Sequence, residues 1–492
     1  MSKFAKTQII KNVGSSWISL GLNTIVGIFL SPFILHRLGD SAFGLWVLIY
    51  SLTGYYGLFD LGIRSSIVRY VAKYSATHEY GELNRLINTA MCCYAVIGAI
   101  CFVITLVGVR YLDSWFNLPP HLLVSARWLF LMVGGAVSLG FPLGVFGGIL
   151  EGLQRFYLMN LNRTISTLTR AILIVIALRH GEGLLTVAFL TVVPPLFTAA
   201  MNGMIVMHLL PLHFGRSNVD RTSLRRIASY SGTTFMIAIA DPLRFKTDAV
   251  VIGTFLSSVA ITYFSIASRV VDYAGDVVSG LGQIFVSMSS HFDATGDLPS
   301  LRKVLINGNR SCALVIFPIA TILIVLGKSV IETWVGVRYV AAAYPVLLVL
   351  LIPGTIMLAQ SASPGILWGM AKHRTLAYIV LSEGVVNLVL SIILVRRLGI
   401  IGSAWGTAIP QICVNVLFLP QHLCRIFKIS VWTYLRDAFT LPLGLCFPLV
   451  LTLLLLQRWF VPHTYFQLGF QLSIAASVYG LCLLWAIKTK QI

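Results

Sequence analysis

Eight ionised side chains lie within three strongly apolar stretches of this chain, and their chemistry needs explaining. A lone charge near the centre of a bilayer costs roughly 2.5–3.5 kcal/mol on insertion scales. Eight of them cannot all face lipid, so they must line a hydrated cavity, pair with one another, or do both. They are Arg170 in the stretch near 157–178, Asp241, Arg244, Lys246 and Asp248 near 230–255, and Arg269, Asp272 and Asp276 near 260–284.

The spacing of these charges places most of them on single helical faces. Asp241, Arg244 and Asp248 are separated by three and then four residues, which brings side chains to one face of a helix. The set that begins at Arg269 repeats this spacing, whereas Lys246 lies off the first face. One interpretation is therefore an ion-pair network that holds two neighbouring helices together.

The second interpretation is a binding cavity for an anionic ligand. The cations that would bind it are Arg170, Arg244, Lys246 and Arg269. The carboxylates are candidates for ion pairing or ion coupling, and they are Asp241, Asp248, Asp272 and Asp276, with Asp60 nearer the inner face. The eight charged side chains within the apolar stretches are four cations and four carboxylates, so their charges cancel. The cavity can be cationic only if the side chains are arranged so that the cations face it.

The sequence shows no arrangement typical of an enzyme or of a metal site. The histidines are scattered without metal-ligand spacing, and no loop expected outside is long enough to shelter a nucleophile and its base. The eight cysteines lie in or at the ends of apolar stretches and are interpreted as packing residues. We therefore predict no enzymatic activity, no metal and no cofactor.

The charged residues must be positioned by a bundle of membrane-spanning helices. Of the 492 residues, 57% are hydrophobic and only 11% are charged, which is more apolar surface than a soluble core can bury. Fourteen apolar stretches of roughly 20 residues are long enough to cross a hydrocarbon layer of about 30 Å. They lie near 13–35, 42–63, 87–109, 128–150, 157–178, 184–209, 230–255, 260–284, 307–327, 341–363, 376–395, 400–420, 439–457 and 467–487. The predicted fold class is an all-α integral membrane protein.

An internal repeat divides the first twelve stretches into two equivalent halves. The segment 83–87 returns at 301–305, 218 positions later, and 149–155 returns at 366–372, one residue out of that register. Two like-oriented six-helix lobes around a central cavity are typical of a transporter. The predicted domains are 1–212 and 230–429 for the lobes, 213–229 for a basic cytoplasmic linker, and 430–492 for two additional helices.

The net charge of +19 is explained by membrane topology. Lysine and arginine concentrate in the segments that lie inside if the N-terminus is cytoplasmic, so the positive-inside rule predicts that both termini are cytoplasmic. Basic segments at a membrane surface also contact anionic lipid. No loop is long enough to hold a basic folded module, so a nucleic-acid partner is not expected.

Three motifs resemble one family of bacterial membrane proteins. The segment 31–46 reads SPFILHRLGDSAFGLW, 60–70 reads DLGIRSSIVRY, and 149–155 reads ILEGLQR. Together they resemble the bacterial polysaccharide exporters, the O-antigen and capsule flippases. The resemblance is sharpest over 12–75 and extends in organisation to about residue 430.

This resemblance implies the fold of the multidrug and toxic-compound extruders. It implies translocation of undecaprenyl-diphosphate-linked oligosaccharide from the cytoplasmic to the periplasmic leaflet of the bacterial inner membrane. Members of the family line the cavity between their lobes with basic residues. In this sequence the positions consistent with such a lining are those of Arg170, Arg244, Lys246 and Arg269. The partners it implies are the lipid-linked substrate, membrane lipids, and a polysaccharide polymerase with a chain-length regulator.

The first apolar stretch differs from that of two related branches. Drug-extruding relatives commonly carry an acidic coupling residue there, and lipid II flippases carry basic and acidic residues, whereas residues 13–35 hold no charge. Both differences favour the O-antigen-type branch. The alternative is a cation- or proton-coupled multidrug antiporter of the same fold. A membrane-embedded glycan polymerase would need a large outer loop, which this sequence does not provide.

Overall fold

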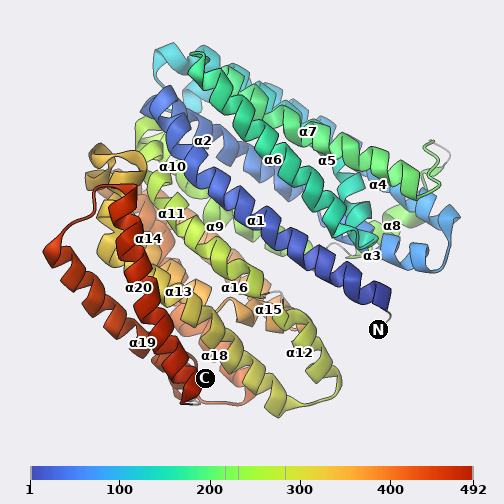
Figure 1. Ribbon diagram of the computed structural model, residues 1–492. Coiled ribbons are helices and arrows are strands. Elements are labelled where there is room, and N and C mark those ends of the chain that lie inside the picture. Colours follow the sequence, from blue (N-terminus) through green and yellow to red (C-terminus); the bar gives the residue numbers. More distant parts are fainter. Residues whose placement is uncertain (1–2, 216–217, 231, 283, 490–492) are drawn as a thin grey trace. The chain divides into compact units, whose positions relative to one another are not determined.

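The computed structural model describes residues 3–215, 218–230, 232–282 and 284–489, so positions 216–217 of the predicted linker lie outside the described residues. The described chain is built from helices and contains no strand, which confirms the all-α class. It divides into two compact units, Met1–Thr262 and Tyr263–Ile492, each of which is described by itself (Figure 1).

The first unit is a bundle in which α4 packs on α5, α5 on α7, and both α1 and α7 on α6. One buried cluster of this unit includes Ile67, Leu86 and Ile149, all inaccessible to solvent. Near its end, α9 and α10 pack on η1 and α2. The elements are α1 (Lys3–Leu38), α2 (Asp40–Gly54), η1 (Tyr55–Asp60), α3 (Ile63–Ala76), α4 (Tyr80–Trp115), η2 (Pro120–Leu122), α5 (Leu123–Gly152), α6 (Phe156–Arg179), α7 (Leu184–Leu209), α8 (Arg221–Tyr230), α9 (Gly232–Phe245) and α10 (Thr247–Phe255).

The second unit contains most of α11 and all later helices. The long helix α13 packs on α14 and α19, and α19 in turn packs on α20, so the two C-terminal helices extend this bundle (Figure 1). The elements are α11 (Ser258–Gly282), α12 (Ile284–Ala294), α13 (Leu298–Val335), η4 (Val337–Tyr339), α14 (Val340–Ala359), α15 (Ala362–Gly369), α16 (Arg374–Leu398), α17 (Ile400–Ile412), the π-helical η5 (Cys413–Phe418), α18 (Leu419–Phe427), α19 (Val431–Trp459) and α20 (Tyr465–Lys488).

Twelve segments of the described chain are long and apolar enough to cross a membrane. The two predicted spans that are not among them are the two that carry the clustered charges. Lys246 divides the stretch 230–255 into α9, of 14 residues, and α10, of 9, and neither alone reaches across about 30 Å. The next stretch forms α11, which has the length but carries three charges. The count of fourteen spans is therefore approximate, and the exceptions coincide with the candidate site.

The internal repeat extends to backbone conformation. His78 has φ 58° and Gly296 has φ 68°, and these positions are 218 residues apart. Gly181 and Gly399, also 218 apart, have φ 83° and 63°. Positive φ is uncommon for residues other than glycine, and its recurrence at these repeat-related positions indicates that the two halves turn the chain at equivalent places.

The junction after the fourth span is also repeated. Gln154 and Ala371 both end their turns with positive φ, 55° and 54°. A Cβ on Gly152 would meet the carbonyl oxygen of Val68, and a Cβ on Gly369 would meet that of Val286, the residue 218 positions after Val68. Glycine at both places lets two helices approach closely in each half.

Candidate functional site

The motifs at 60–70 and 149–155 meet at one end of the first unit. The guanidinium of Arg64, at the start of α3, donates to Glu151 Oε2 at the end of α5 through Nη2 (3.0 Å) and Nε (3.2 Å). Asp60, at the end of η1, accepts a hydrogen bond from the hydroxyl of Tyr94 on α4. Left-handed Gly62 turns the chain between Asp60 and Arg64. The candidate coupling residue Asp60 is thus held by α4.

Arg170 continues a polar seam between α1 and α6. The amide of Asn160 on α6 donates to the hydroxyls of Ser15 and Ser16 on α1, at 3.1 and 2.9 Å. Two turns further along α6, the hydroxyl of Thr167 donates to Asn23 Oδ1 on α1 at 2.8 Å. Arg170 follows Thr167 by one turn, is half-buried, and lies within electrostatic range of Tyr50 on α2. The Nε atom of Arg170 is buried, so this side chain lies within the first unit.

Lys246 lies at the break in the seventh predicted span. Its backbone N–H donates to the carbonyl oxygen of Pro242 at 2.8 Å, ending α9 before α10 begins. The side chain is exposed, and its stem would lie 3.6–3.7 Å from a Cβ on Gly54. The next residue, Thr247, hydrogen-bonds the hydroxyl of Tyr55 at 2.9 Å. This contact fixes the break against the end of α2.

The two other cation candidates lie on separate helices. Arg244, half-buried on α9, is one turn from exposed Asp241, within electrostatic range, and its guanidinium lies 4.9 Å from the ring centroid of Phe245. Arg269 is exposed on α11 in the second unit.

The four mid-membrane carboxylates differ in exposure. Asp248 is only 6% exposed, at the start of α10 near Tyr55, which makes it the most buried of the candidates. On α11, Asp272 is exposed and Asp276 is half-buried. Between them Tyr273 packs edge-on against Trp334, with ring centroids 6.0 Å apart. Because α11 is one continuous helix, Arg269, Asp272 and Asp276 share a face, as the spacing predicted.

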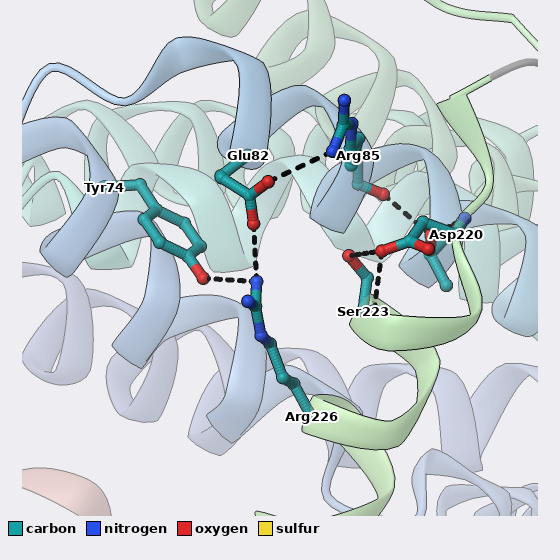
Figure 2. Close-up of polar contacts among 7 residues, drawn as sticks. Tyr74, Glu82, Arg85, Asp220, Ser223 and Arg226 are labelled. Atoms are coloured by element: carbon teal, nitrogen blue, oxygen red, sulfur yellow. Dashed lines mark hydrogen bonds and ion pairs between the residues drawn. The ribbon is translucent and has the colours of Figure 1, made fainter.

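The linker helix α8 forms contacts that the sequence did not reveal (Figure 2). Arg226 Nη1 donates to Glu82 Oε2 at 2.6 Å and to the hydroxyl of Tyr74 at 2.8 Å, while Arg85 pairs with the other oxygen of Glu82 at 3.2 Å. The hydrogen bond from Arg226 to Glu82 raises the pKa of the guanidinium. Ile227 is 2% exposed and joins the buried cluster of the first unit. The helix is docked on α3 and α4.

The start of α8 is fixed as well. Asp220 accepts a hydrogen bond from the backbone N–H of Ser223 at 3.1 Å (Figure 2). Its own N–H donates to Thr89 Oγ1 at 3.0 Å. Hydrogen bonds from the backbone of Thr222 and Ser223 lower the pKa of Asp220. Asp220 therefore acts as the N-cap of α8, and an aspartate directly before a helix is a capping pattern that can be recognised in the sequence.

We expect Glu82→Gln to loosen α8 without removing any basic residue. A partly exposed pair of this kind contributes about 1 kcal/mol, so local opening of α8 should increase about fivefold. Trypsin, which cuts at the unchanged Arg221 and Arg225, measures this opening as a cleavage rate. Glu79→Gln, at an exposed position one turn earlier, is the matched control. Equal cleavage rates in the two variants would contradict the docking role of Glu82.

The fold defines a class of protein. A multidrug resistance MATE transporter of the MOP superfamily, inward-facing, has a TM-score of 0.71 at 13% identity, over 83% of this chain and 95% of that one. Lipid II flippase MurJ, inward closed, also has a TM-score of 0.71, at 15% identity over 96% and 98%. The chain therefore has the fold of a multi-pass membrane transporter.

Sequence comparison gives the family. Residues 9–285 match the profile described as "Polysaccharide biosynthesis protein", so the chain belongs to that family. It is 21% identical over 442 residues, 86% of this chain and 100% of the relative, to the Shigella flexneri protein named "Putative O-antigen transporter". It is 22% identical over 435 residues, 84% and 83%, to "Uncharacterized membrane protein EpsK" of Bacillus subtilis (strain 168). The resemblance to polysaccharide exporters is confirmed, and one of these relatives is named as a transporter.

Proposed function

We propose that the chain translocates undecaprenyl-diphosphate-linked oligosaccharide, an O-antigen, capsule or exopolysaccharide repeat unit, from the cytoplasmic to the periplasmic leaflet. The observation that carries the proposal is family membership together with similarity along the whole length of a protein named as an O-antigen transporter. The cations within otherwise apolar helices supply the chemistry that a diphosphate needs.

The physical task is to move a sugar head group through hydrocarbon. Each unpaired hydroxyl costs roughly 4–8 kcal/mol on entering alkane, so a head group of a few sugars does not cross unaided. A wet, polar cleft that opens sideways removes most of this cost while the polyprenyl tail remains in lipid. The proposed lobes, 1–212 and 230–429, expose the cleft to each leaflet in turn.

The basic candidates bind the diphosphate in this proposal. They are Arg170, Arg244, Lys246 and Arg269. The carboxylates hold these cations in place before the ligand arrives or couple ion movement, and they are Asp241, Asp248, Asp272, Asp276 and Asp60. The protein acts in the bacterial inner membrane with both termini cytoplasmic, next to a polysaccharide polymerase and a chain-length regulator.

Deletion of the gene in its host tests the function. We expect lipid-linked oligosaccharide to accumulate on the cytoplasmic side and surface polymer to disappear, with both restored by the plasmid-borne gene. Normal surface polymer in the deletion strain, without a second transporter of this family, would contradict the proposal.

The second candidate function is a cation- or proton-coupled multidrug antiporter. Deeply buried Asp248 favours it, because such a pump needs a carboxylate that takes up a proton or a cationic drug. The two functions differ in the sign of the ligand's charge, which is negative for the diphosphate and positive for a cationic drug. Drug resistance conferred by the intact chain and lost in Asp248→Asn, with surface polymer unchanged, would support the antiporter.

The membrane potential is the proposed energy source, because residues 13–35 carry no coupling carboxylate. A diphosphate with about two negative charges gains roughly 4–5 kcal/mol on leaving a cytoplasm that is 100 mV negative. We expect translocation in sealed vesicles to slow at least tenfold when valinomycin and potassium collapse the potential. An unchanged rate under these conditions, with nigericin as the control for the pH gradient, would overturn this energy source.

A further inference from the structure

A cavity of about 270 Å³ lies between α12 and α13 in the second unit. Phe285, Met288 and Phe292 of α12 form its apolar wall. The other wall carries Lys303 and Asn307, one turn apart on α13, followed by Ser311. The cavity therefore has one hydrocarbon side and one polar side.

The repeat shows what the equivalent place does in the first unit. Phe292 and Lys303 correspond to Tyr74 and Arg85, which lie 218 positions earlier on α3 and α4. There the space is covered by α8, which packs on both helices and donates from Arg226 to Tyr74 and Glu82 (Figure 2). The first repeat thus fills this groove with a segment of its own chain.

The second repeat uses the corresponding segment in another way. Residues 438–448 would match α8 and the chain around it, but they belong to α19, which packs on α13 and α20. Arg310 of α13 donates to the carbonyl oxygen of Asp437 at the start of this packing. Among the described residues, the groove is lined by α12 and α13 alone.

The charge of the groove has also changed between the repeats. Glu82, which accepts Arg226 in the first unit, corresponds to Ser300, whereas Arg85 corresponds to Lys303. The lining that the structure describes contains Lys303 and no carboxylate. Asp297 lies within electrostatic range of Lys303, but it caps α13 by accepting from the backbone N–H of Ser300 at 3.0 Å. The groove has kept its cation and lost the acid, so it suits an anionic occupant.

We infer that this groove binds an anionic phospholipid, with the phosphate at Lys303, Asn307 and Ser300 and an acyl chain against Phe285, Met288 and Phe292. The depth fits, because α13 has 38 residues, about 57 Å, and its first turns extend past a hydrocarbon layer of about 30 Å into the head-group region. The inference does not depend on the proposed transport function.

Native mass spectrometry of the intact protein, released from nanodiscs with equal phosphatidylglycerol and phosphatidylcholine, tests the inference. One cation at a membrane surface favours an anionic lipid by about 1 kcal/mol, so we expect about fivefold more retained phosphatidylglycerol than phosphatidylcholine. Lys303→Gln should bring this ratio close to one. Lys488→Gln, an exposed lysine at the end of α20, is the matched control and should keep the ratio.

A second variant separates the groove from the general charge of the surface. Met288→Trp should fill the apolar wall and lower retention of both lipids, with the melting temperature unchanged because Met288 is exposed. Equal retention in the intact protein, Lys303→Gln and Met288→Trp would overturn the site. So would a protein subunit, in place of lipid, crosslinked to a photoreactive residue at position 307.

Discussion

Glutamine in place of Arg244 or Arg269 is expected to slow translocation strongly while the protein still reaches the membrane. The substitution keeps a polar side chain but removes the charge that the diphosphate requires. A hydrogen bond to a charged group contributes about 1.5–3 kcal/mol, so each variant should translocate about 10- to 100-fold more slowly. Lipid-linked oligosaccharide that accumulates in complemented deletion cells measures the loss, and proteoliposomes with a labelled glycolipid give the rate.

Matched variants on the same helices make this result specific. Asp241→Asn and Asp272→Asn each lie three residues from the corresponding arginine and should slow translocation much less. Arg458→Gln, at an exposed position near the end of α19, controls for expression and insertion. Larger losses in the aspartate variants than in the arginine variants would favour the antiporter.

Exchanging one pair distinguishes binding from structural pairing. The double variant Asp241→Arg and Arg244→Asp keeps both charges on one face of α9 and reverses their order. If the pair only stabilises the bundle, thermal stability and translocation should both recover relative to the single variants. If Arg244 binds the ligand, stability should recover and translocation should not.

The sequence contained most of the information about the helical spans and the repeat. Long apolar stretches can satisfy their backbone in a membrane only as helices, so the positions and order of twelve of the fourteen predicted spans follow from the sequence. The interruption at Lys246 was not foreseen, although Pro242 and four nearby charges provided a signal. Hydropathy averages over a window, and a single-residue break between two helices disappears in that average.

Contacts between distant residues could not be derived in the same way. Arg64 and Glu151 are 87 residues apart, and the motifs that contain them gave no indication that their side chains meet. The docking of α8 depends on Glu82 and Tyr74, which lie in other helices and whose orientation is set by packing. The sequence therefore predicted only a basic linker at 213–229, and the burial of Ile227 in the first unit appeared only in the structure.

The crossing of α2 with the first turn of α11 depends on one glycine. A Cβ on Gly44 would overlap with the backbone carbonyl of Ser258 and lie 2.8 Å from Thr262 Oγ1. At the same crossing Thr262 Oγ1 donates to the carbonyl oxygen of Asp40 at 2.7 Å. Asp40 and Gly44 correspond to Ser258 and Thr262 in the repeat, 218 positions later, so equivalent turns of equivalent helices meet here. The first repeat supplies the small residue and the second supplies the hydrogen-bond donor.

Gly44→Ala is therefore expected to destabilise the protein strongly. The obstructing atom belongs to the backbone and cannot rotate away, so the helices must separate, at a cost of about 1–3 kcal/mol or more. Thermal unfolding in detergent should show a melting temperature several degrees lower. Thr262→Ala should cost only its hydrogen bond, about 1 kcal/mol. It should not rescue Gly44→Ala, because the carbonyl of Ser258 remains.

Gly140→Ala on α5 gives the opposite expectation from the same chemical change. No atom lies within 4 Å of a Cβ at that position, so the added methyl group meets open space. Alanine is also the better helix former, by roughly 0.5–1 kcal/mol, and the melting temperature should stay the same or rise. Opposite changes in melting temperature for the two variants would show that the close helix crossing, and not helix propensity, causes the loss of stability in Gly44→Ala. If Gly44→Ala melted at or above the temperature of the unmodified protein, the close approach of α2 to α11 would be wrong.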